Sequence, residues 1–143
     1  MAPAPSDRPY VMRPQVDPNL IAGWIALARS ESGTPEHDQR FWAFDRVCEL
    51  CRDEPEAAWQ FILAVLEIDR SDRIVQNLSA GPLEDLLAKH PQQAIGWVEL
   101  EAKTNPHFAS LLGGVWQNAM PDDVWARVQA VWDRRGWDDI PAA

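Results

Sequence analysis

The chain has 143 residues, 46% hydrophobic and 24% charged, a balance typical of a folded domain and not of a disordered chain. Its 22 acidic residues outnumber the 13 basic ones, and the formal net charge is −9. A field of this sign repels phosphate backbones and anionic lipid surfaces. We therefore expect no nucleic acid and no membrane as partner, and a protein partner, if there is one, of basic character.

The start of the sequence carries prolines at positions 3, 5, 9 and 14 and lacks the apolar centre of a signal peptide. No stretch approaches the ~18 consecutive apolar residues that span a bilayer. Two cysteines do not make a disulfide framework. We expect a cytoplasmic protein with a flexible proline-rich arm over residues 1–16 and a single all-helical domain over residues 17–143.

Proline recurs at the starts of the predicted helices. Asp17-Pro18 and Thr34-Pro35 each combine an N-cap residue with proline in the first turn, and they predict helices that run to about residue 30 and about residue 52. Spacings of three and four residues predict a buried face on each helix. These faces comprise Leu20, Trp24, Leu27 and Ala28 on the first helix, and Phe41, Phe44, Val47, Cys48 and Cys51 on the second.

A third helix is predicted after Asp53 and Pro55, and it is apolar nearly all round, which is typical of a helix in the middle of a domain. Ser71 begins a short fourth helix. Gly81 is expected to end that helix, and Pro82 to start a fifth one that runs to about residue 90.

The remaining predicted helices begin at Pro91, Pro106 and Pro121, and the last is expected to end at Gly136. No run of strict alternation predicts a strand. The segments that start at Pro55 and Pro91 share a proline, an alanine and four apolar positions, at a separation within the period of about 34–47 residues of helix-pair repeats. We expect an all-α fold of about seven to eight helices, arranged as HEAT-like antiparallel pairs or as an irregular bundle.

Cys48 and Cys51 form the one motif that suggests redox or metal chemistry. A redox pair needs its first cysteine at a helix N-terminus, whereas these two lie late in a predicted helix, and a zinc site needs two more ligands. We interpret both as buried helical residues. The three histidines are scattered, carboxylate pairs one or two residues apart lie on different helix faces, and no known catalytic motif is present. The expectation is a protein that is not an enzyme and has no metal and no cofactor.

Eight tryptophans accompany a single tyrosine. Trp24, Trp59, Trp125 and Trp132 fall on apolar stripes and are expected in the core. The other four either attach loops to the core or lie on the surface as interface anchors. The candidate protein-binding surface joins acids near helix junctions with two of these tryptophans: Asp53, Glu54, Glu56, Asp69, Asp72, Trp97 and Trp116.

Three segments carry a family resemblance: GPLEDLLAKH over residues 81–90, Gly114-Val115-Trp116, and PDDVWARVQ over residues 121–129. Together they resemble a family of uncharacterised bacterial proteins, over roughly residues 20–132. The resemblance implies a small bacterial helical domain of unknown function, with no activity or ligand set to carry over. It indicates residues 81–85 and the region of Trp116 as the first place to look for a shared surface.

The leading hypothesis is a non-enzymatic module that binds a basic protein, and its concrete form is an immunity protein or antitoxin that neutralises a toxin. Electrostatic steering is its physical support. The alternatives are an accessory domain whose charge only keeps it in solution, and an enzyme with an unrecognised site. A contiguous exposed apolar patch would favour binding, whereas converging ionisable groups in a concave pocket would favour an enzyme. The oligomeric state stays open.

Overall fold

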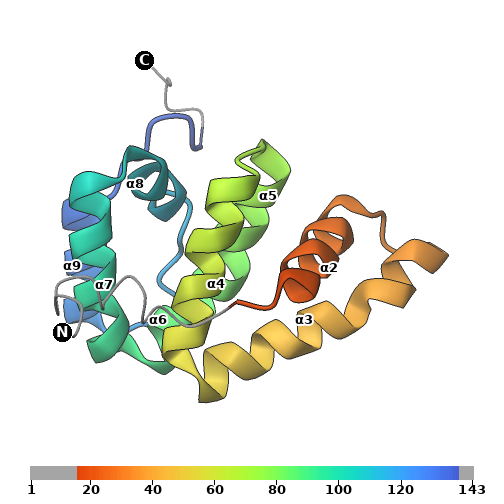
Figure 1. Cartoon of the computed structure of the whole chain (residues 1–143). Helices are drawn as coiled ribbons and strands as arrows, with labels where there is room; N and C mark the ends of the chain where they lie inside the picture. The colour runs from red at the N-terminus through yellow and green to blue at the C-terminus, as the bar shows by residue number, and fades with distance from the viewer. Residues whose placement is uncertain (1–15, 139–143) are drawn as a thin grey trace, which may run out of the picture.

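The computed structural model describes residues 16–138, and within this range the chain forms helices joined by short loops, without a strand. The prediction of an all-helical fold is confirmed. The predicted flexible arm, residues 1–16, lies outside the described residues except for its last one. In Figure 1 the chain runs from α2 and α3 on one side, through α4 and α5 in the middle, to α7, α8 and α9 on the other side.

Helices α2 (Pro18–Arg29) and α3 (Pro35–Asp53) begin where the sequence predicts. The side chains of Asp17 and Thr34 accept hydrogen bonds from backbone N–H groups in the first turn of their helices, which otherwise have no partner there. The longer α3 passes beneath α2 along one edge of the molecule (Figure 1).

Helix α4 (Pro55–Ile68) lies in the middle of the molecule and contacts α2, α3, α5, α6 and α8 (Figure 1). This position agrees with its composition, because a helix that is apolar on several sides is stable only where neighbours cover those sides. Its buried residues are Ala58, Trp59, Phe61, Ile62, Val65 and Leu66.

The segment after α4 corrects the prediction that a helix ends at Gly81. Helix α5 (Asp72–Leu78) continues without a break through a π-helical turn, η2 (Ser79–Leu83), into α6 (Glu84–Lys89). Pro82 has no N–H to donate, and in a regular α-helix its ring would clash with the carbonyl four residues earlier. The wider π-turn accommodates the ring, so the helix continues.

Helices α7 (Pro91–Thr104), α8 (Pro106–Leu112) and α9 (Asp122–Val131) complete the fold. The last helix ends at Val131 and not at Gly136, which lies in a later turn with φ +91°. Buried residues from α2 to α9 form one hydrophobic core. No helix in this part of the chain combines the length and hydropathy that crossing a bilayer demands.

The helices α4 and α7, which suggested a repeat, have the same length of 14 residues. The residues before their prolines, Glu54 and His90, also adopt similar backbone conformations, with φ/ψ of −137°/69° and −133°/56°. This similarity is local to the two helix starts. The HEAT-like pairing of helices stays a prediction.

Candidate functional site

A groove of about 600 Å³ lies between α2, α3 and the continuous segment from α5 to α6, and it is called the α3 groove below. Its walls are mostly apolar. The α2 wall contains Trp24, Leu27 and Ala28, the α3 wall contains His37, Phe41, Phe44, Val47 and Cys48, and the opposite wall contains Ala80, Gly81, Pro82 and Asp85.

The structure corrects the prediction that Phe41 and Phe44 are buried with the rest of their helix face. Their side chains are 43% and 46% exposed, whereas Val47 and Cys51 of the same predicted face are buried. The physical reason is that the apolar face of α3 is wider than its neighbours cover. Its buried stripe enters the core, and the adjacent stripe, from His37 to Cys48, borders the groove.

Aromatic rings line the α3 wall in a row. The ring centroids of Phe41 and Phe44 lie 5.1 Å apart, and the ring of His37 lies 6.0 Å from that of Phe41. Trp24 is buried at the base of the groove and packs edge-on against Phe61 in the core, with 5.7 Å between centroids. The groove therefore has a firm aromatic base and an exposed aromatic wall.

At one end of the groove, polar groups satisfy the C-terminus of α2. His37 Nδ1 lies 3.0 Å from Ser30 Oγ. The Arg73 guanidinium donates to the carbonyl oxygens of Ala28 at 2.8 Å and of Ser30 at 3.3 Å. A cation at this position complements the negative end of the helix. These ionisable groups therefore have structural partners within the chain.

Carboxylates lie beside Cys48 at the other end of the groove and along the exposed side of α3. Burial raises the pKa of the Cys48 thiol, and the nearby charges of Asp85 and Asp45 raise it further, against a smaller opposite effect of Lys89 and Arg52. Asp38 and Asp45 lie three residues before and four residues after Phe41, so they flank it on α3. Within residues 16–138 neither they nor Asp85 form an ion pair. These three carboxylates are called the acidic rim.

The two cysteines differ in their surroundings. Cys48 is half-buried on the groove wall, whereas Cys51 is buried and its Sγ donates to the carbonyl oxygen of Pro82 at 3.6 Å. Burial raises the pKa of Cys51 to about 12. Both thiols are therefore protonated near neutral pH, which agrees with a packing role and not with a thiolate nucleophile or ligand. The expectation that both are buried was wrong for Cys48.

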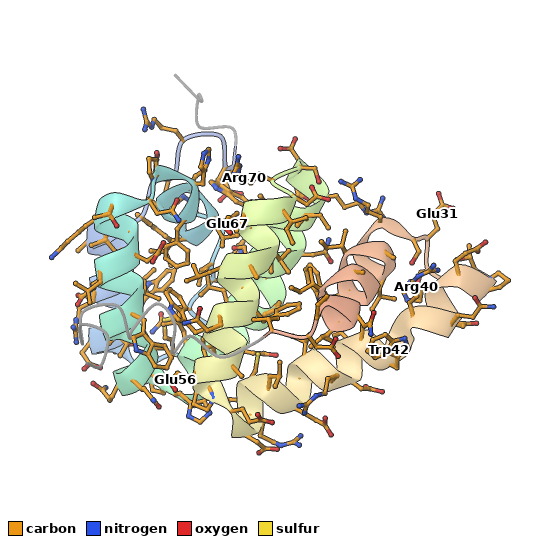
Figure 2. All side chains as sticks on the ribbon, viewed as in Figure 1. Glu31, Arg40, Trp42, Glu56, Glu67 and Arg70 are labelled. Atoms are coloured by element: carbon orange, nitrogen blue, oxygen red, sulfur yellow. The ribbon has the colours of Figure 1, made fainter. Side chains whose placement is uncertain are left out.

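The predicted acidic residues fall into two separate groups. Asp53, Glu54 and Glu56 lie where α3 meets α4, and Asp69 and Asp72 lie where α4 meets α5. Figure 2 shows that these junctions lie at opposite ends of α4, with Glu56 at one end and Glu67 and Arg70 at the other. The structure therefore does not bring the five acids together in one surface.

Three of these acids also have arginine partners in the chain. Asp53 pairs with Arg52 at 2.9 Å, Glu54 with Arg46 at 3.5 Å, and Asp69 with Arg29 at 2.6 Å. The Arg29 hydrogen bond is the main cause that lowers the pKa of Asp69 to about 2. Charge that is already paired steers a partner less than free charge does.

The two predicted tryptophans also lie apart. Trp97 is partly buried and stacks on Trp59 at 5.9 Å between centroids, so it extends the core. Trp116 is 65% exposed, and its backbone N–H donates to Glu84 Oε2 at 2.9 Å. Glu84 thereby joins the segment of residues 81–85 to the Trp116 region, the two places that the family resemblance indicates.

The site residues that sequence reasoning missed are Phe41 and Phe44 as exposed residues, together with the small residues that face them, Ala80 and Gly81. A signal was present in the sequence. Around residues 41–51, apolar positions extend over more of the helix circumference than a single neighbouring helix covers. An apolar surface this wide indicates either a helix in the middle of the domain, as α4 is, or a helix with part of its apolar surface left exposed.

One protein-family model, described as a family of unknown function (DUF6869), matches residues 30–136. Comparison with curated proteins and with solved structures gave no match. The matched region contains the α3 wall of the groove and the wall from α5 to α6, and it begins after α2. The chain therefore belongs to the DUF6869 family.

Proposed function

We propose that the chain is a non-enzymatic protein-interaction module that binds an apolar segment of a partner protein in the α3 groove. The supporting observation is the pair of exposed rings, Phe41 and Phe44, beside a groove with apolar walls. Contiguous exposed apolar surface next to a concavity is typical of a binding site. Covering the exposed half of each ring contributes about 1 kcal/mol per residue, since full burial of phenylalanine contributes roughly 1.5–3 kcal/mol.

The acidic character supports a basic partner. The net charge of −9 provides long-range attraction to a basic partner, and the acidic rim, of which Asp85 lines the groove, provides carboxylates that form no ion pair within the described residues. An immunity protein or antitoxin that neutralises a basic toxin is the concrete form of this proposal.

The chemistry of the groove walls supports binding over catalysis. His37 and Arg73 hydrogen-bond to the end of α2, and the pKa of Cys48 is raised and not lowered. A catalytic nucleophile or base needs a pKa that approaches the working pH and a partner aimed at the reacting atom. The groups on these walls instead hold the groove in shape.

The substitution Gly81→Leu tests the proposal, because Gly81 lines the groove and a Cβ added there meets nothing within 4 Å among the described residues, so a larger side chain has room. Gly96→Leu is the matched control, since Gly96 lies on α7 and also has nothing within 4 Å of an added Cβ. We expect both variants to fold like the wild type.

The measurement is quantitative mass spectrometry of proteins that co-purify with each variant from the native organism. A partner that binds in the groove is retained by Gly96→Leu and lost from Gly81→Leu. Equal recovery of every co-purified protein with the two variants contradicts the proposal.

A further inference from the structure

The backbone around the α3 groove offers no partner to an extended peptide. The walls are helices whose N–H and C=O groups bond within the helices, and residues 16–138 contain no strand and hence no sheet edge. An extended segment in this apolar groove would bury peptide groups without hydrogen bonds, which is unfavourable. A helical segment satisfies its own backbone and presents only side chains.

The α3 wall has the spacing of a helix-packing surface. His37, Phe41, Phe44 and Cys48 follow one another at intervals of four, three and four residues, the pattern by which two helices pack side by side. This stripe covers about 16 Å of helix axis, at 1.5 Å per residue. It therefore matches about three turns of a second helix.

The opposite walls permit a close approach. Ala28 ends the α2 wall, and Ala80 and Gly81 form part of the wall between α5 and α6. An added Cβ at Gly81 would lie in open space, so no side chain among residues 16–138 fills that position. Small residues opposite aromatic ones leave room for the side chains of an incoming helix.

The acidic rim favours a basic occupant. Asp38, Asp45 and Asp85 form no ion pair with arginine or lysine within the described residues. Asp85 lines the groove, whereas Asp38 and Asp45 flank the stripe on α3 outside the groove lining. A second copy of this chain would bring the same three carboxylates and another net charge of −9 to the interface. Like charges oppose such pairing, whereas lysine or arginine on the occupant is attracted.

We infer that the occupant of the α3 groove is an amphipathic α-helix of a different protein, with its apolar face between Phe41, Phe44 and Gly81 and with lysine or arginine beside Asp45 and Asp85. This inference rests on the proposed function and adds the conformation, charge and orientation of the bound segment.

Photo-crosslinking tests the inference and separates it from the proposed function. The full chain is expressed in its native organism with a photoreactive phenylalanine analogue in place of Phe41, or of Leu100, an exposed apolar residue on α7 outside the groove. Crosslinked peptides are identified by mass spectrometry. The expected product forms only from position 41, and its sequence has apolar residues at intervals of three and four together with lysine or arginine.

Each other outcome has a defined meaning. The absence of any crosslink specific to position 41 contradicts the proposed function itself. A specific crosslink to a proline-rich or alternating segment, or to an acidic one, leaves protein binding in place and overturns the inference. A crosslink to a second copy, or to residues 1–15 of the same chain, overturns the inference as well.

A synthetic peptide of the crosslinked segment then tests the charge and orientation. We expect Asp85→Lys to weaken its binding at least tenfold and Glu56→Lys, which changes the net charge equally but lies on α4 outside the groove, to weaken it less than threefold. Replacing the basic residue of the peptide by glutamate should restore binding to the Asp85→Lys variant. Equal losses for the two variants, or no restoration, contradict the placement of the basic residue beside Asp85.

Discussion

Glu84, at the start of α6, accepts a hydrogen bond at 2.9 Å from the backbone N–H of Trp116, 32 residues later in the chain. The other carboxylate oxygen accepts from the side-chain amide of Asn118, a residue with a positive φ of 46°. Glu84 is 8% exposed. A buried carboxylate thus fixes the loop before α9 at the backbone of Trp116 and the side chain of Asn118.

Replacing Glu84 by glutamine tests this role. Glutamine keeps the shape, but its NH₂ group faces a donor, so a buried hydrogen bond is lost and we expect a decrease of about 1–3 kcal/mol in the free energy of unfolding. Urea unfolding measures this change. The control Glu67→Gln on α4 should change the free energy by less than 0.5 kcal/mol, as is usual for a surface position. Equal effects of the two substitutions contradict the structural role of Glu84.

The pH dependence of this effect has a defined sign. Burial raises the pKa of Glu84 above its ordinary value of 4.5, so the folded state holds the proton more tightly than the unfolded state does. This contribution to stability is complete below pH 4.5 and is lost as the pH rises through the folded pKa. The stability advantage of the wild type over Glu84→Gln should therefore shrink between pH 4 and pH 7. An advantage that grows with pH contradicts the raised pKa.

The two thiols should react differently with an alkylating reagent. Cys48 borders the groove, whereas Cys51 is buried and has a pKa of about 12. We expect iodoacetamide to modify the native protein once, at Cys48, with a rate that increases up to and beyond pH 9 because that pKa is raised. Cys51 should react only in denaturant. Peptide mapping checks this, and modification of Cys51 at the rate of Cys48 contradicts the packing between α3 and η2.

Features of the fold that depend on neighbouring residues could be predicted from the sequence, whereas features that depend on tertiary packing could not. The starts of α2 and α3 were predictable because Asp17 and Thr34 cap helices that begin at the next residue, and each accepts from an N–H group two or three residues away. The π-turn at Gly81 was not, because Pro82 is tolerated only where the helix can widen. Residue propensities predict that a helix ends at glycine and proline. They do not include the tertiary packing that keeps this helix continuous.

The site shows the same limit. The stripe that contains Phe41 and Phe44 was predictable from its spacing, but whether another helix covers it depends on where the segment from α5 to α6 lies. The pairing of Asp69 with Arg29, 40 residues apart, was also inaccessible, since nothing in the local sequence brings them together. An acid counted as available charge was therefore already neutralised.

The glycines offer a test of how tightly the C-terminal part is packed. A Cβ at Gly113 would lie 2.2 Å from the backbone carbonyl oxygen of Asp133, and that backbone is held by a hydrogen bond from Asp133 N to Ala109 O of 2.9 Å. Gly113→Ala should therefore lower the free energy of unfolding by about 1–3 kcal/mol, as overpacking does. Gly81→Ala, which meets nothing within 4 Å, is the control and should leave it unchanged or raise it slightly. Similar losses for both contradict the packing at Asp133.

The exposure of the groove rings makes a prediction about stability as well as binding. Because Phe41 and Phe44 are already close to half exposed, Phe41→Ala and Phe44→Ala should each cost about 1 kcal/mol or less, whereas Phe61→Ala, in the fully buried core, should cost about 3–5 kcal/mol. Thermal or urea unfolding of the three variants gives this order directly. A small cost in stability, together with loss of the groove partner, attributes the rings to binding. If either groove variant is destabilised as strongly as Phe61→Ala, the rings belong to the core and the α3 groove is not an open binding surface.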